Sequence, residues 1–235
     1  LTYIDKIKIF KGNVYTSFGS ALHETCEKLV FNESLKYEEF FQDSFSAEIN
    51  KLETTTPKEL KLIEEMKSQG TELAALILKG LQDKFPEYSV FSAEEEIMEP
   101  LENSPHDYDY KGFLDLVIKT PDGKYHIIDW KSCSWGWDIR KKTDRIITYQ
   151  LTYYKNFFCK KHNIDPKMVE TYFGLLKRTA KKNRVEIFRV SSGERKINNS
   201  LKTLNKAVYN IHNNNHPKNR LNCQKCEFNK SEWCP

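Results

Sequence analysis

Two aspartates and a lysine stand on neighbouring predicted strands of this 235-residue chain. Asp115 lies in one strand, and Asp129 and Lys131 lie two residues apart in the next. Because successive side chains of a strand alternate between its faces, Asp129 and Lys131 should point to the same face. Carboxylate oxygens bind Mg²⁺ or Mn²⁺, and a nearby lysine can orient a water molecule and balance phosphate charge. These three side chains could therefore hold a divalent metal ion beside a phosphodiester.

The neighbours of these three residues are apolar. Both predicted strands are rich in leucine, isoleucine and valine, which indicates a mostly buried sheet. Charged groups in such a sheet are costly unless they are paired or bind a metal. An Asp-x-Lys triplet on its own is more often an exposed, salt-bridged strand edge, so the assignment depends on the rest of the chain.

The composition is that of a globular chain. Hydrophobic residues make up 39% and charged residues 30% of the sequence, which excludes a disordered polymer. No apolar run approaches the roughly 18 residues of a membrane span, so we expect no membrane partner. The net charge of +4 is too small to establish a polyanionic partner, although basic residues cluster at 140–145 and 177–184. We expect one domain with a small terminal appendage.

Hydrophobic periodicity and turn residues predict the order of the elements. A helix begins at Thr16 or Ser17 and carries His23 at the edge of its apolar stripe, and a longer helix runs from Pro57 to near Pro86. The other predicted elements are strands at 88–98, 110–119 and 124–132, a helix at 143–162, strands at 171–177 and 185–190 and a helix at 194–212. The first three strands indicate an antiparallel meander. The whole order predicts an α/β fold with a central mixed β-sheet flanked by helices.

One further pair lies in the 143–162 helix, where Gln150 and Tyr154 are one turn apart and share a face. The ordered set of motifs is His23, Gly112-x-x-Asp115, Asp129-x-Lys131 and Gln150-x-x-x-Tyr154. This set resembles the RecB-type branch of the PD-(D/E)XK nucleases, which includes the RecB and AddB nuclease domains, CRISPR-associated adaptation nucleases and phage exonuclease-like proteins. The resemblance covers almost the whole chain and implies a restriction-endonuclease-like core.

The resemblance also implies roles for these residues. The ligands of Mg²⁺ or Mn²⁺ would be His23, Asp115, Asp129 and the Trp130 carbonyl. Lys131 would be the catalytic lysine, and Gln150 and Tyr154 would complete the catalytic set by organising the site and the DNA backbone. A histidine ligand favours manganese. Outside this motif context, His23 would be read as a core-edge histidine and the Gln150–Tyr154 pair as helix packing.

Three other features have both a functional and a structural interpretation. One glutamate of Glu94–Glu96 could reach the metal, with Glu95 favoured, or all three could form a solvated acidic face. Trp135 and Trp137 could stack on unpaired bases or pack in the core. The basic segment 177–184 could follow the DNA backbone or form a solvated charged turn.

Six cysteines and no signal-peptide pattern suggest a reducing, cytoplasmic location. Cys223-x-x-Cys226-x7-Cys234 has the spacing of metal ligands, but three thiolates are one ligand short. Similar nucleases close a 4Fe-4S cluster with three C-terminal cysteines and one cysteine upstream of the histidine motif. The chain begins at Leu1 rather than Met, so we expect the fourth ligand upstream of residue 1. In the alternative interpretation, the three cysteines bind Zn²⁺ and His216 is the fourth ligand.

The predicted domains follow from these motifs. A nuclease-like domain would span 1–220, with N-terminal helices at 16–85, a core at 88–190 and a C-terminal helix at 194–212. Residues 221–235 would form a C-terminal cysteine clip that holds zinc or an iron–sulfur cluster. Cys26 is out of position for this clip, and Cys133 and Cys159 are expected to be small buried residues.

The resemblance implies a divalent-metal-dependent deoxyribonuclease, and we favour an exonuclease. It would hydrolyse phosphodiester bonds at DNA ends or in single-stranded segments during recombination, repair or replication, in a bacterial or phage-infected cell. The chain has no Walker loop or helicase motif, so strand unwinding would come from a helicase or recombination protein as a partner. One alternative is a non-catalytic nucleic-acid-binding scaffold with the same fold. A zinc-dependent hydrolase built on the cysteines is disfavoured because no His-Glu-x-x-His motif is present.

Overall fold

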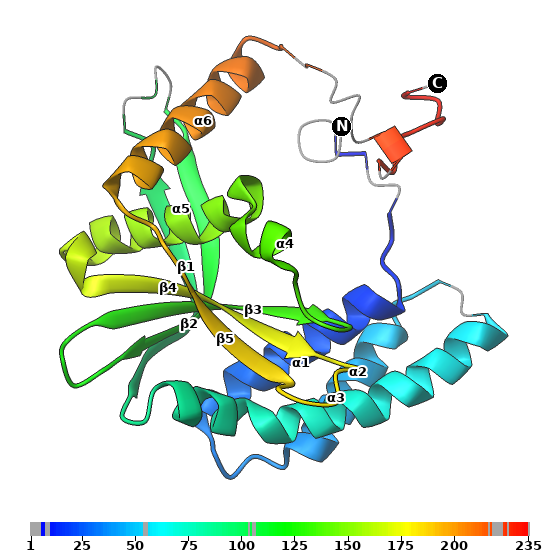
Figure 1. The fold of residues 1–235 in the computed structure, drawn as a ribbon. Coiled ribbons are helices and arrows are strands. Elements are labelled where there is room, and N and C mark those ends of the chain that lie inside the picture. The colour runs from blue at the N-terminus through cyan, green and yellow to red at the C-terminus, as the bar shows by residue number, and fades with distance from the viewer. Residues whose placement is uncertain are drawn as a thin grey trace.

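A five-stranded mixed β-sheet lies between two layers of helices (Figure 1). The computed structural model describes residues 6, 7, 10–53, 56–102, 104, 107–215, 217, 223, 224 and 226–234. The strands are adjacent in chain order and are β1 (Ser89–Pro100), β2 (Asp109–Lys119), β3 (Tyr125–Cys133), β4 (Val169–Lys177) and β5 (Val185–Val190). The prediction of an α/β fold with a central mixed sheet is confirmed.

The sheet is mixed because one of its ladders is parallel. β1–β2, β2–β3 and β4–β5 are antiparallel, whereas β3 and β4 run parallel, with Tyr125 opposite Val169 and Cys133 opposite Lys177. Parallel neighbours need a long crossover connection. Here the crossover consists of α4 (Ile139–Thr143), α5 (Arg145–His162) and a short 3₁₀ helix (Pro166–Met168).

Each face of the sheet has its own apolar core. The helices α1 (Val14–Phe31), α2 (Tyr37–Ile49) and α3 (Pro57–Lys84) cover one face, and α5 and α6 (Glu194–His212) cover the other (Figure 1). Ile128 and Trp130 of β3 point to the first core, and Ile127 points to the second. The strand alternation expected for this segment is therefore confirmed.

Side-chain caps set where the predicted helices begin. Asn13 caps α1 and forms a reciprocal capping box with Thr16, with N–O distances of 3.0 and 2.9 Å. The prediction that Thr16 or Ser17 is the cap is wrong, because Thr16 is the third helical residue and completes this box. The predicted start of α3 at Pro57 is confirmed, with Thr56 as its cap.

Two helical features were not predicted. α2 was missed because its cap residue, Lys36, makes no side-chain cap hydrogen bond, and because only Phe41 and Phe45 of the helix are buried. The helix predicted at 143–162 is confirmed as α5, which begins at Arg145 because the Asp144 side chain accepts hydrogen bonds from the backbone of Ile146 and Ile147, whereas α4 before it was not predicted. No described helix is both long enough and apolar enough to span a bilayer.

Candidate active site

The candidate site lies where β2 and β3 separate. Their ladder runs from Lys119–Tyr125 to Leu116–Ile128 and ends there, whereas β3 stays paired with β4 as far as Cys133. The Trp130 backbone N–H donates a hydrogen bond to Asp115 Oδ2 at 2.7 Å. The Asp115 carboxylate thus accepts the hydrogen bond that a β2 carbonyl would accept in a continued ladder. This hydrogen bond holds Asp115 beside the Asp129–Lys131 segment.

Asp129 is a buried acid with Lys131 as its close cationic neighbour among the described residues. Its side chain is 1% exposed, and among the described residues neither carboxylate oxygen accepts a hydrogen bond of normal geometry. Lys131 Nζ lies 2.6 Å from Asp129 Oδ2 and forms an ion pair with it. One ammonium group beside two buried oxygens leaves acceptor capacity for a further cation.

The two carboxyls perturb one another. Burial raises the pKa of Asp115 to about 7, against the opposing effects of the Trp130 amide and Lys131. Burial also raises the pKa of Asp129 to about 7, and the nearby Asp115 charge raises it further, while Lys131 opposes the rise. Two carboxyls that resist ionisation at neutral pH form a site that a divalent cation would stabilise.

His23 approaches this pair from the middle of α1. Its Nδ1 lies 3.5 Å from Asp115 Oδ2, and its ring also forms a hydrogen bond with the backbone of Trp130. Burial lowers the pKa of His23, although Asp129 opposes this effect, so the imidazole is neutral at neutral pH. The neutral ring is the form that binds metal ions. The structure therefore places Asp115 in contact with His23 and with the Trp130 amide, and Asp129 is near enough to influence the pKa of His23.

An acidic groove of about 600 Å³ opens onto this cluster between α1 and β1. Its lining includes His23, Glu27, Glu94 and Asp115. Glu94 has a φ of +48°, an unusual backbone conformation for a residue with a side chain. Burial raises the pKa of Glu94, and the neighbouring Glu27 raises it further.

The preference for Glu95 is wrong. Its Oε1 lies 2.6 Å from both Lys161 Nζ and His162 Nε2 at the end of α5, and its Oε2 accepts a hydrogen bond from Ser92. Glu94 is the glutamate at the groove. The positive φ of Glu94 is the reason that the sequence did not reveal this, because a local irregularity of the strand cannot be read from alternation.

Gln150 and Tyr154 border the site from α5. Gln150 Nε2 donates a hydrogen bond to Tyr154 Oη at 3.0 Å. Burial raises the pKa of Tyr154 to about 12; the hydrogen bond from Gln150 opposes the rise, whereas the charges of Asp129 and Asp115 add to it. The tyrosine is therefore within electrostatic reach of both carboxylates. Gly112 leaves room for it, since a Cβ at that position would lie 3.0 Å from the Tyr154 ring.

The buried indole of Trp130 holds the Asp129–Lys131 segment in place. Trp130 is 1% exposed and belongs to the core formed with α1–α3. Gly174 lies opposite it on β4, and a Cβ there would come within 2.2 Å of the Trp130 ring. The flat ring thus packs directly on a glycine backbone, with charged residues before and after it pointing the other way.

The donor set fits a cation that keeps open coordination positions. Within the described parts of the chain, no three histidine, cysteine, aspartate or glutamate side chains close into a metal site. Mg²⁺ usually keeps several waters and is held by one or two carboxylates together with substrate phosphate oxygens. The Asp129 carboxylate, the neighbouring Asp115 and the neutral His23 ring are of the donor types that suit that mode of binding.

The aromatic and basic residues after β3 differ in burial and in the elements that they contact. Trp137 packs against Phe173 and Phe188, with ring centroids 5.1 and 6.4 Å away, so core packing is the correct interpretation for it. Trp135 is exposed. In the basic segment 177–184, both arginines contact α3, because Arg178 donates to Gln69 and Arg184 forms an ion pair with Glu72.

The predicted cysteine clip is described only in part. Cys223, Cys226 and Cys234 are free thiols, and the Cys226 N–H donates to the Cys223 carbonyl at 3.1 Å. The Phe10 N–H donates to Glu227 at 2.8 Å, so the two ends of the chain meet there (Figure 1). His216, the alternative ligand, lies outside the described residues. Cys159 is buried as expected, and Cys133 is partly buried.

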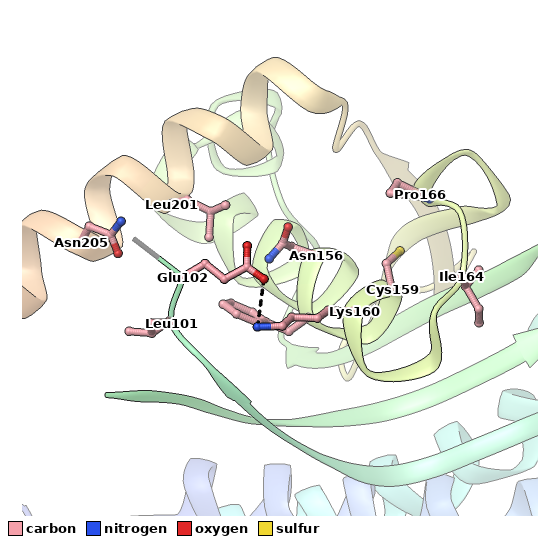
Figure 2. Close-up of a pocket in the computed structure, with 10 residues that line it drawn as sticks. Leu101, Glu102, Asn156, Cys159, Lys160, Ile164, Pro166, Leu201 and Asn205 are labelled. Atoms are coloured by element: carbon pink, nitrogen blue, oxygen red, sulfur yellow. Dashed lines mark ion pairs between the residues drawn. The ribbon is translucent and has the colours of Figure 1, made fainter. Parts of the chain in front are cut away.

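A second cavity, of about 340 Å³, lies between α5, α6 and the end of β1 (Figure 2). An ion pair of 3.1 Å between Lys160 and Glu102 crosses it. None of the predicted site residues lines this cavity, so it is separate from the candidate active site.

A mixed sheet whose strands β2 and β3 separate beside two carboxylates and a lysine, with helices on both faces, is a nuclease-like α/β architecture. The family model described as PD-(D/E)XK nuclease superfamily matches residues 1–235. The chain therefore belongs to the PD-(D/E)XK nuclease superfamily, and this membership supports a hydrolytic nuclease.

Among solved structures, the crystal structure of a candidate exonuclease from Eubacterium rectale has a TM-score of 0.61 and 13% identity, over 100% of this chain and 81% of that chain. At this identity the likeness shows a shared fold. The crystal structure of SSO0001 has a TM-score of 0.41 and 16% identity over 92% of this chain and 94% of that chain, which is too weak to support an inference. No curated protein matches the sequence.

Proposed function

We propose that this protein is a divalent-metal-dependent deoxyribonuclease. The observation that carries the proposal is the Asp129 carboxylate, which is buried beside Asp115 and has only the Lys131 ammonium as a close cationic neighbour among the described residues. A fold retains such a costly group where a cation compensates it. Family membership supports the nuclease activity, and the DNA substrate, the metal requirement and the residue roles belong to the proposal.

The chain's own groups would divide the work of phosphodiester hydrolysis. Asp115, Asp129, His23 and the Trp130 carbonyl would hold Mg²⁺ or Mn²⁺, which when bound polarises a phosphoryl oxygen and lowers the pKa of a coordinated water. Lys131, held beside Asp129, would orient the attacking water and balance phosphate charge. The products would carry a 5′-phosphate and a 3′-hydroxyl.

The pair on α5 would position the substrate. Gln150 and Tyr154 hydrogen-bond to one another and are fixed against Gly112 of β2. The Asp129 and Asp115 charges act on Tyr154, which supports a place for the pair beside the scissile backbone. Small displacements of such positioning groups reduce rates strongly.

Two substitutions test the assignment directly. Lys131→Ala and Asp129→Ala should each reduce Mn²⁺-dependent cleavage of DNA by about 10²–10⁴-fold, as expected for loss of a proton-handling or charge-stabilising group. Lys206→Ala, which removes an exposed lysine of α6, is the matched control and should cleave normally. Cleavage retained by both site variants would contradict the proposal. Metal-independent DNA binding without cleavage by the wild-type protein would instead favour a non-catalytic scaffold.

The mode of cleavage needs substrates with defined ends. End-labelled linear, circular and single-stranded DNA with Mn²⁺ would distinguish an exonuclease from an endonuclease. We favour an exonuclease, which would leave circular DNA intact and release short products from one end of linear DNA. Product length and label position then give the polarity.

We further propose that Cys223, Cys226 and Cys234 bind zinc or an iron–sulfur cluster. The short Cys-x-x-Cys spacing supports chelation of one centre by two thiolates. An ultraviolet–visible spectrum and metal quantification of the full-length, anaerobically purified protein would identify the metal. Cys226→Ser should lower its content, whereas Cys159→Ser, at a buried position of α5, should leave it unchanged.

A further inference from the structure

The three most exposed large apolar side chains of the described residues all follow the Asp129–Lys131 segment. Trp135, Ile139 and Ile146 are 74%, 73% and 80% exposed, and the next, Phe31 at the far end of α1, is 63% exposed. Single exposed apolar side chains are ordinary on a protein surface. Three within twelve consecutive residues form an apolar patch that needs an explanation.

This apolar patch borders the candidate active site. Trp135 comes four residues after Lys131, and four residues of chain span at most about 14 Å. Ile146 lies one turn before Gln150 and therefore on the same side of α5. Ile139 begins α4, which packs against α5 beside the C-terminal end of β3 (Figure 1).

The local fold holds Trp135 outward. Two residues later, Trp137 is anchored in the core against Phe173, with Lys141 above its ring at 4.5 Å. Between the two tryptophans, Gly136 adopts a φ of +120°, which makes the turn possible. A tryptophan displayed by an anchored turn is ordered before any ligand arrives, which lowers the entropic cost of binding.

The charges around the apolar patch are positive. Arg140 and Arg145 are exposed and form no ion pair with any described residue. The two acids of this segment are occupied, since Asp138 caps α4 and Asp144 caps α5. Exposed aromatic and aliphatic groups among free cations suit unpaired bases with their phosphates, because bases stack on the rings while cations neutralise the backbone.

We propose that Trp135, Ile139 and Ile146 form a binding platform for the unpaired bases of single-stranded DNA and guide its backbone to Asp129 and Lys131. The inference rests on the proposed nuclease function and gives it a substrate preference. A blunt duplex hides the faces of its bases from such a platform, so a single strand or a frayed end is bound more tightly.

Binding of a labelled oligothymidine of about 15 nucleotides, measured by fluorescence anisotropy in EDTA, tests the platform without cleavage. Trp135→Ala should weaken binding about fivefold or more, as expected for the loss of one stacked base, and Trp135→Phe should restore most of the affinity. Ile146→Ala should weaken it as well. Phe31→Ala removes an exposed aromatic side chain outside the platform and should bind like the wild type.

Specific results would overturn the platform. One is that Trp135→Ala binds the oligonucleotide as tightly as the wild type does. Another is that Trp135→Ala loses as much affinity for a blunt hairpin duplex as for the single strand. A third is that light scattering gives Trp135→Ala a different molar mass from the wild type, which would assign the patch to contact between copies of the chain. Cleavage of the same oligonucleotide with Mn²⁺ separates the two proposals. A wild-type protein that binds through Trp135 but never cleaves contradicts the nuclease function and leaves the platform standing.

Discussion

A buried carboxylate with a single cationic neighbour weakens a fold, and Asp129 beside Lys131 is such a residue. Its pKa is raised by burial and by Asp115, so the folded chain holds this proton more tightly than the unfolded chain does. The stability that the proton contributes is fully present below the ordinary pKa of 3.8 and is lost as the pH rises to about 7. Above that pH, the metal-free protein carries a buried negative charge whose counter-ion is Lys131, at a cost in desolvation.

Asp129→Asn should therefore stabilise the metal-free protein while abolishing cleavage. At pH 8 in EDTA we expect a Tm increase of about 2–4 °C, equivalent to about 1 kcal/mol for a chain of this size. At pH 4 the increase should vanish, because the wild-type carboxyl is then protonated. Thermal unfolding at the two pH values measures this, with the exposed Asp83→Asn as a control. A lower Tm at pH 8 would mean that the Asp129 charge already has a sufficient partner.

His23 should set the choice of metal. A nitrogen donor suits Mn²⁺ better than Mg²⁺, so His23→Ala should raise the Mn²⁺ concentration for half-maximal cleavage by about tenfold or more. The Mg²⁺ requirement should change less. Metal titrations of cleavage at pH 8 measure both values, and a matching shift for the two metals would show that His23 acts by positioning Asp115 instead.

The charged residues of the site could be predicted from the sequence, but some of the residues around them could not. Asp129 and Lys131 were paired correctly, because two residues on a regular strand must share a face. Glu94 was missed, because its positive φ breaks that regularity. Trp135 and Trp137 could not be separated, because the turn at Gly136 that buries one and exposes the other depends on packing against distant β4 and β5.

At the scale of elements, β4 supports the site through a residue without a side chain. Gly174 lets the Trp130 ring lie against the β4 backbone, and the Trp130 amide and carbonyl in turn face Asp115 and His23. A change in β4 is therefore transmitted to the site through one indole ring.

Gly174→Ala should consequently reduce stability and activity together. A Cβ 2.2 Å from the Trp130 ring must displace it, at a cost of about 1–3 kcal/mol for overpacking. Thermal unfolding and cleavage assays measure the two effects. Gly193→Ala is the matched control, since nothing lies within 4 Å of the added methyl group and only a small cap effect is expected. Full activity of Gly174→Ala would show that the position of Trp130 does not determine the site.

The elements that were predicted correctly have strong local signals. The α3 start at Thr56 and Pro57 combines a cap with a helix-favouring proline, and the hairpin at Pro121–Gly123 joins two strongly apolar strands. α2 lacks both kinds of signal, and its two buried phenylalanines gain their role only from Phe18 of α1, which packs edge-on against them. Tertiary packing, rather than local preference, stabilises that helix.

At the scale of the whole molecule, the net charge is small, but acidic and basic residues are concentrated in different regions. The net charge is only +4, so attraction for DNA depends on where unpaired cations lie. The groove beside α1 is acidic and suits a cation, whereas the surface at α4 and the start of α5 is basic and suits phosphates. The acidic groove includes His23 and Asp115, and the basic surface follows Lys131 in the chain, so the two regions lie on either side of the proposed reaction site in the sequence.

This arrangement predicts different salt responses for two substitutions. Arg145→Ala should reduce the magnitude of the slope of log affinity against log salt for single-stranded DNA by about 0.7, the value for one phosphate contact. Trp135→Ala should lower affinity with little change in slope, because stacking releases no counterions. Binding titrations between low and high salt measure both slopes. An unchanged slope for Arg145→Ala would remove it from the DNA path.

The parallel ladder between β3 and β4 also has a consequence during synthesis. All three charged groups and His23 have left the ribosome once residue 131 has emerged, yet the strand that supports Trp130 and the helix that carries Gln150 and Tyr154 come later. A nascent chain at that stage contains α1–α3, β1 and β2 and the acids of the site, but it lacks β4, which packs against Trp130, and α5, which carries Gln150 and Tyr154. The site can therefore form only after the crossover and β4 have been synthesised. Until then, the messenger RNA being translated lies beside an incomplete site.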